Sequence, residues 1–229
     1  MFALVRMRLT GFVRTGRALA PLIAGLVVLG VLYGGGQAQA GEAYGVSAAV
    51  LFPVLAWQAK LLLDAEPDVQ RRLALVAVGS RYRELVAGLL AATLAALVTV
   101  VVALVLPWLV GGIRGPRSAG EAPLSEGITL GVWAHLLAVP AAVALGALAS
   151  RAATRSTTYG IVVLVGGAVG AVVMGLKNSV APWLAPPVMA TARALSGGPD
   201  GVAVVTLTLQ ALLWSAAVLT GYAWLRRRW

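Results

Sequence analysis

The chain has 229 residues and a net charge of +10, and although 60% of its residues are hydrophobic, only 11% are charged. A soluble domain carries roughly 25% charged residues, so this composition, with a mean hydropathy of +0.90, excludes an ordinary water-soluble domain and predicts an integral membrane protein. Basic residues gather at the cytoplasmic ends of membrane helices, so we expect membrane lipid, and no nucleic acid, to attract this charge.

The first 16 residues are amphipathic rather than uniformly apolar. On a helical wheel one side holds Met1, Phe2, Val5, Leu9, Phe12 and Val13, and the other holds Arg6, Arg8, Thr10, Arg14 and Thr15. This pattern predicts an interfacial helix lying among the lipid headgroups. A signal peptide with a cleavage site at Ala38-Gln39-Ala40 is the alternative, but the length and charge pattern of the segment favour the interfacial helix.

Six apolar stretches follow, each close to the roughly 20 residues that a helix needs to cross a bilayer. They cover residues 18–35, 45–63, 85–110, 128–149, 159–176 and 202–224. Strands of a membrane barrel would be about ten residues long and would alternate in polarity. The sequence therefore predicts one all-α transmembrane domain over residues 1–229, with six transmembrane helices.

Residues 64–84, between the second and third stretches, contain a short predicted helix. Pro67 suits the first turn of a helix, and the acidic Glu66 and Asp68 suit the positive end of its dipole. Gly79 suits the end of the helix. We expect a cytoplasmic helix over residues 67–78, with arginines on both flanks.

The fifth stretch is rich in glycine, and Gly166 and Gly170 form a G-x-x-x-G motif. This spacing lets two helix backbones approach closely, either in a dimer or inside the bundle. The ordinary enrichment of glycine in membrane helices is an equally good explanation. After this stretch, Pro182, Pro186 and Pro187 interrupt residues 177–201, which we expect to form short helices that dip back into the outer interface.

The basic residues predict the orientation in the membrane. With six spans, both termini lie on one side. The other side holds four basic residues, Arg114, Arg117, Lys177 and Arg193. The remaining fourteen of the 18 are Arg6, Arg8, Arg14, Arg17, Lys60, Arg71, Arg72, Arg81, Arg83, Arg151, Arg155, Arg226, Arg227 and Arg228. The positive-inside rule therefore places both termini in the cytoplasm, and a preference for arginine over lysine suggests a bacterial cell membrane.

The chain lacks the residues of several catalytic and binding chemistries. Neither of its two lysines, Lys60 and Lys177, stands in the G-x-x-x-x-G-K-[ST] motif that holds ATP phosphates. Metal sites need clusters of histidine, cysteine or carboxylate, but the chain has no cysteine and a single histidine, His135. Lys60 is the other ionisable residue of the spans and can snorkel to the cytoplasmic interface. We therefore expect no enzyme, no metal and no cofactor on this chain.

The order of these parts resembles the ABC-2 family of ATP-binding-cassette exporter permeases over nearly the full length. The family begins with an interfacial connecting helix, as residues 1–18 do. Its second cytoplasmic element runs from acidic and basic residues into a glycine, a small residue and an arginine, like EPDVQRRLALVAVGSRYRELVAG at residues 66–88. APWLAPPVMATARALSGG at residues 181–198 resembles its outer re-entrant helices. The family's usual glycine after the acidic residue is replaced by Gln70-Arg71-Arg72.

The resemblance implies half of an exporter driven by a partner. The chain would pair with a second copy or a paralogue and with two separate ATPase subunits, which would carry ATP and Mg. Residues 64–84 would be the coupling loop that docks on the ATPase. The implied coupling residues are Glu66, Asp68, Arg71, Arg72, Leu75 and Gly79. Because the spans offer few polar groups, we expect a hydrophobic or amphipathic cargo such as a drug or antibiotic, a lipid or a peptide.

Three alternatives remain open from the sequence. The chain could be an ATPase-independent channel or carrier, which would need a continuous polar pore. It could be an intramembrane enzyme centred on His135, although a satisfied structural histidine is the simpler interpretation. The arginines of the 64–84 loop could bind anionic lipid alone, but lipid binding does not require the apolar run Leu73–Val78.

Overall fold

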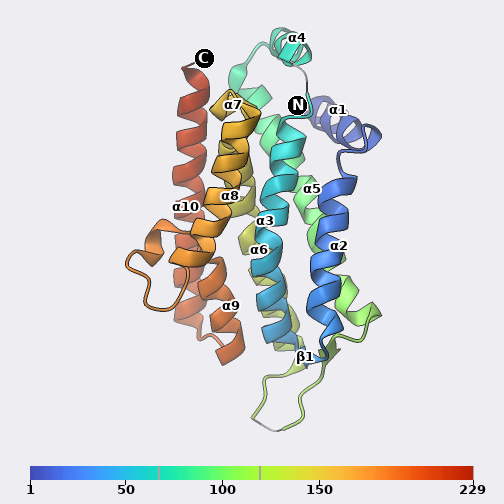
Figure 1. Cartoon of the computed structure of the whole chain (residues 1–229), viewed down its shortest axis with the longest axis vertical. Helices are drawn as coiled ribbons and strands as arrows, with labels where there is room; N and C mark the ends of the chain where they lie inside the picture. Colours follow the sequence, from blue (N-terminus) through green and yellow to red (C-terminus); the bar gives the residue numbers. More distant parts are fainter. Residues whose placement is uncertain (67, 119, 229) are drawn as a thin grey trace.

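Long helices form a bundle in the computed structural model, which describes residues 1–66, 68–118 and 120–228 (Figure 1). The long helices are α2 (Leu19–Gly34), α3 (Ala40–Leu63), α5 (Arg81–Leu109), α6 (Leu124–Leu148), α8 (Thr157–Met174) and α10 (Gly201–Arg227). Five of them, all except α2, are long and apolar enough to cross a membrane. The bundle is therefore that of an all-α, multi-pass membrane protein.

The first apolar stretch is the exception in length. α2 has 16 residues, which gives a rise of about 24 Å against a hydrocarbon thickness of about 30 Å. It follows α1 (Phe2–Arg14) at a bend of 72°, and the pair counts as a sixth span only when the two helices are taken together. The structure thus supports five or six spans.

Shorter elements connect the long helices. They are α4 (Asp68–Val78), α7 (Arg151–Thr154), the 3-10 turn η1 (Pro182–Leu184), α9 (Val188–Gly197), and the two-residue strands β1 (Ala38–Gln39) and β2 (Ile113–Arg114). The strands pair in parallel, with Ala38 opposite Ile113. Both chain ends lie at the same end of the bundle as α1, α4 and α7, and β1 lies at the opposite end (Figure 1).

Helices α3 and α6 form the centre of the bundle, and small residues let them approach closely. A Cβ atom at Gly146 would overlap the carbonyl oxygen of Ala56, and one at Gly131 would overlap the ring of Tyr44. In lipid, where no hydrophobic force drives helices together, such close backbone packing is a main source of association. Helices α8 and α10 lie outside this centre, and only 17% and 11% of their apolar windows are buried, against 61% for α3 and α6.

Helices α8 and α10 are connected by a segment that forms two short helical elements of its own. After Met174 the chain turns through η1 and then forms α9, which packs on the first turns of α3. A Cβ atom at Gly45 would lie 3.1 Å from the carbonyl oxygen of Ala192, and one at Gly41 would lie 3.2 Å from that of Leu195. The proline-rich segment therefore runs along the bundle, as Figure 1 shows for α9.

The amphipathic first helix forms, but its sides are used differently from the prediction. Val5 and Phe12 pack into the core, whereas Phe2 and Val13, predicted on the same apolar side, remain exposed. Arg8, predicted on the polar side, is buried, with a side-chain exposure of 7%. The physical reason is that two carboxylates from other elements surround the Arg8 guanidinium, which compensates its burial.

Candidate functional site

Helix α4 projects beyond the ends of the long helices, at the end that carries both chain termini (Figure 1). It ends at Gly79, whose φ of +66° is the left-handed conformation that favours glycine. The Gly79 N–H donates to the Leu75 carbonyl at 2.9 Å, and Ser80 then caps α5 by accepting from the Arg83 N–H. The predicted helix over 67–78 is confirmed as Asp68–Val78, and Pro67 lies outside the described residues.

The outward face of α4 carries three large apolar side chains. Val69, Leu73 and Val76 are 70%, 64% and 82% exposed. Their spacing of four and three residues places them on one side of the helix, and we call them the α4 stripe. Ala74 instead packs toward the core. An apolar row at an exposed end of a protein marks an interaction surface more often than an isolated exposed residue does.

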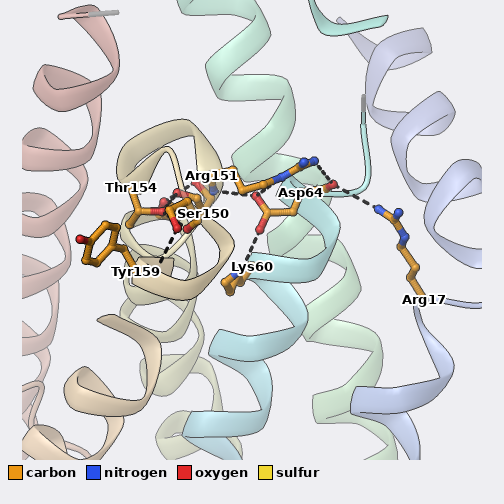
Figure 2. Close-up of polar contacts among 9 residues, drawn as sticks. Arg17, Lys60, Asp64, Ser150, Arg151, Thr154 and Tyr159 are labelled. Carbon is orange, nitrogen blue, oxygen red and sulfur yellow. Dashed lines mark hydrogen bonds and ion pairs between the residues drawn. The ribbon is translucent and has the colours of Figure 1, made fainter. Parts of the chain in front are cut away.

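Asp64 anchors the first leg of the α4 segment (Figure 2). Its carboxylate accepts from the Lys60 ammonium and from the Arg151 backbone N–H, each at 2.7 Å. Its backbone carbonyl accepts from the guanidinium groups of Arg17, at 3.1 Å, and Arg151, at 2.9 Å. Lys60 is therefore buried in an ion pair rather than reaching into solvent. This leg is held by the α1–α2 link and by α7.

A buried ionic cluster anchors the second leg, which leads into α5, and also holds the first leg through Glu66. The Arg8 guanidinium contacts Glu66 at 2.7 Å and Glu84 at 2.5 Å, and Arg226 pairs with the other oxygen of Glu84. The Glu84 side chain is 1% exposed. These residues come from α1, from the segment before α4, from α5 and from α10. Buried charges are tolerated when they are paired in this way, and we call the four residues the Glu84 cluster.

The two anchors make α4 mechanically continuous with the bundle. A displacement of α4 acts on Asp64 and Glu66 at one leg and on Glu84 at the other. Ion pairs and short hydrogen bonds then connect it to α1, α7 and α10. Chains of packed side chains and ion pairs of this kind can carry energetic coupling between distant sites.

The predicted coupling residues all lie on α4 or on the segments that flank it, but their environments differ. Glu66 points inward to Arg8, and its side chain is 9% exposed. Leu75 is half-buried, and Gly79 forms the turn. The side chains of Asp68, Arg71 and Arg72 lie outside the described part of the structure. Among the described side chains of α4, the large apolar ones that face outward are those of the α4 stripe.

The sequence did not predict the ion pairs that hold the segments on both sides of α4. Arg8, Glu84 and Arg226 are separated by 76 and 142 residues, and no local pattern connects them. One signal was available, because the chain has eight acidic residues and four of them, Asp64, Glu66, Asp68 and Glu84, surround this helix. Carboxylates that are concentrated near scattered arginines would have predicted ion pairs at this end.

The Gly166–Gly170 motif lies on the outer side of α8. No atom of the described chain would come within 4 Å of a Cβ at either glycine. Gly167 faces inward instead, where a Cβ would overlap Leu145 of α6. The sequence predicted that the motif contacts another helix, either inside the bundle or in a dimer. The described residues do not make the contact inside the bundle, so this face of α8 is free to contact a second chain.

His135 is a satisfied buried residue. Its Nδ1 lies 2.8 Å from the Gly131 carbonyl and its Nε2 lies 3.1 Å from the Ser47 hydroxyl. The Tyr44 ring packs edge-on against it, with ring centroids 5.9 Å apart. Ser47 and His135 are 0% and 1% exposed, which favours a structural role for this pair over that of an accessible nucleophile and base.

No protein-family model, curated protein or solved structure matches this chain. The resemblance to ABC-2 permeases therefore rests on the order of the sequence elements alone.

Proposed function

We propose that the chain is the permease subunit of an ATP-driven ABC exporter in a bacterial cell membrane, with both termini in the cytoplasm. Two separate ATPase subunits would bind and hydrolyse ATP with Mg, and a second copy or a paralogue would complete the transmembrane unit. The cargo would be a hydrophobic or amphipathic molecule that leaves the cell. The chain itself carries no ATP-binding P-loop.

The α4 stripe is the observation that carries this proposal. Val69, Leu73 and Val76 stand on a helix that projects past the bundle, where a partner can cover them. Burial of three such side chains at about 25 cal/mol per Å² would contribute several kcal/mol to an interface. A docking helix must also transmit motion, and the Asp64 and Glu84 anchors provide that connection.

The open face of α8 supports the proposed second copy. Gly166 and Gly170 share this face with Val162, Val165 and Val169, which are more than half exposed. Glycine at this spacing lets a second helix approach the backbone of α8. The coupling role of Glu66 is revised within the proposal, because its bond to Arg8 makes it a residue that fixes the leg rather than one that contacts the ATPase.

A pair of matched variants tests the docking. Leu73→Glu adds a negative charge on the α4 stripe, and Gln70→Glu adds the same charge on the flank of the same helix. Because a buried unpaired charge costs several kcal/mol, we expect Leu73→Glu to reduce co-purification of the ATPase about tenfold or more and Gln70→Glu to leave it nearly unchanged.

Vesicles reconstituted with the purified chain distinguish the proposed exporter from a channel or carrier. Cargo flux in vesicles that contain this chain and no ATPase would support a channel or carrier and contradict the proposal. Equal co-purification of the ATPase by both variants would remove the α4 stripe as the docking surface, even if transport still required ATP.

A further inference from the structure

Arg193 lies on α9 without an acidic partner. One of its guanidinium N–H groups donates to the Gly175 carbonyl at 2.6 Å, at the end of α8. Within the described part of the chain, no carboxylate pairs with it, and the residue is exposed. Capping of α8 uses one of the five N–H donors of the guanidinium, so the charge and most of the donors remain available.

The surroundings of Arg193 lie beside the interior of a membrane-crossing helix. Trp214 of α10 donates to the Leu184 carbonyl at 2.8 Å, and Gln210 of α10 donates to the Pro182 carbonyl at 3.4 Å. Arg193 contacts the end of α8, and Gln210 lies nine residues into α10, so the charge stands beside the end of one apolar helix and the flank of another.

Two adjoining hollows meet at this place. A pocket of about 140 Å³ is lined by Arg193, Gly175 and Gln210 together with Trp183. A second, apolar groove of about 750 Å³ runs along α10 between Trp183 and Leu213. The two hollows share Trp183 and Gln210, so a small pocket that carries the Arg193 cation adjoins a long apolar groove. The volume of the groove lies in the range of ligand sites.

We propose that this combined hollow binds an anionic membrane lipid. The guanidinium of Arg193 would hold the phosphate of the headgroup through charge-assisted hydrogen bonds, and an acyl chain would lie in the groove against Leu209, Leu213 and Trp214. A single arginine beside membrane helices offers a planar set of donors that fits the phosphate of such a headgroup. A soluble anion would leave the apolar groove empty, and a neutral lipid would leave the Arg193 charge without a partner.

This inference does not depend on the proposed transport function, and its test contains no ATPase. The full chain is placed in nanodiscs of phosphatidylcholine to which phosphatidylglycerol with brominated acyl chains is added. Bromine quenches tryptophan fluorescence on contact. The difference in quenching between the unmodified protein and Trp183→Phe isolates the signal of the groove, because Trp183 lies on both hollows.

We expect brominated phosphatidylglycerol to quench Trp183 at about tenfold lower mole fraction than brominated phosphatidylcholine does. Arg193→Gln should abolish this preference, whereas Arg193→Lys, which keeps the charge, should retain most of it. Arg117→Gln, which removes an equal charge from a loop away from both hollows, is the matched control and should retain it fully.

Several results would overturn the proposal. Equal quenching by the two lipids, or a preference that survives Arg193→Gln, would mean that the groove takes any acyl chain. Quenching by neither lipid would mean that another occupant, such as a second copy of the chain, covers the groove. If Arg193→Gln does not fold, the test rests on Arg193→Lys and Arg117→Gln, which should both retain the preference. Loss of the preference in both variants would contradict a specific role for the Arg193 charge.

Discussion

Glu84 shows what a single buried charge does in this protein. It is a carboxylate with 1% side-chain exposure, and it is paired with Arg8 from the first helix and Arg226 from the last. Its neutralisation would leave two guanidinium groups without full compensation in a place where water does not reach them. Loss of one partner from such a group is far more destabilising than loss of an exposed ion pair.

We therefore expect Glu84→Gln to lower the free energy of unfolding by about 3 kcal/mol, near the lower end of the range for broken buried pairs. Denaturant unfolding of the detergent-solubilised chain would measure it. The matched control is Glu126→Gln, which removes an exposed carboxylate from the first turn of α6 and should have little effect. Similar stability of the two variants would contradict the structural role of the Glu84 cluster.

Glu121 gives a pH-dependent prediction at the other end of the molecule. The hydrogen bond from Arg114, followed by that from the Arg117 backbone N–H, lowers the pKa of Glu121 to about 2 from its ordinary value of 4.5. The stabilisation from its charge is therefore fully present above pH 4.5 and is lost as the pH falls through about 2. NMR titration of the carboxyl carbon should show Glu121 ionised at pH 4, and a midpoint near 4.5 would contradict the pairing.

At the scale of elements, α8 differs from the helices around it. Its inward side touches α6 through Gly167, while Gly166 and Gly170 stand on a side that no described residue covers. Lipid can cover an apolar face, but side chains of lipid-facing helices do not need to be small. The exposed pair of glycines at one-turn spacing therefore favours a helix as the neighbour.

A comparison of two glycines tests this interface. Gly166→Leu places a large side chain on the open face of α8, and Gly30→Leu does the same on α2, where a Cβ also meets no atom within 4 Å. Overpacking of an interface costs about 1–3 kcal/mol, so Gly166→Leu should weaken self-association or association with a paralogue about tenfold or more. Energy transfer between labelled chains in liposomes would measure it. Equal effects of the two variants would assign the α8 face to lipid.

At the scale of the whole molecule, the long apolar helices form the bundle and α4 projects from one end of it. The Glu84 cluster connects the segments on both sides of α4 to α1 and α10. In the proposed assembly, a force on α4 would therefore act on both of these helices rather than on a single span.

This arrangement gives a prediction for the complete assembly. Arg71→Glu together with Arg72→Glu reverses two charges on α4 without changing any apolar span. We expect membrane insertion to stay intact while ATP hydrolysis by the partner is uncoupled from transport. Parallel assays of ATP hydrolysis and cargo movement in proteoliposomes would measure the ratio, and normal coupling would remove α4 from the transmission path.

The spans and α4 could be predicted because their signals are local. Apolar runs of about 20 residues have one stable form in lipid, and a glycine such as Gly79, here with a φ of +66°, commonly ends a helix in the left-handed conformation. The bounds of α2 were predicted as well, because the stretch at residues 18–35 forms a helix over Leu19–Gly34. The bend of 72° between α1 and α2 was not predicted, because the direction in which α1 leaves Gly16 depends on contacts that are distant in sequence, such as those of Arg8.

The candidate site was predictable in part for the same reason. The position of α4 followed from the sequence, but the inward turn of Glu66 did not, because its partner Arg8 is 58 residues away. The orientation of the fifth span was also beyond the sequence. Gly160 and Gly167 face the bundle while Gly166 and Gly170 face outward, and the four look equivalent until the neighbours of α8 are known.

The Glu84 cluster also has a consequence for how the protein is made. Arg8 is synthesised before Glu84, and Arg226 is synthesised 142 residues after it. During synthesis, Arg8 can therefore pair with Glu84 as soon as α5 forms, whereas Arg226 joins the pair only after α10 has been made. A chain interrupted before residue 226 lacks one of the two arginines that compensate the buried Glu84 carboxylate, so the cluster is complete only when α1, α5 and α10 are all present.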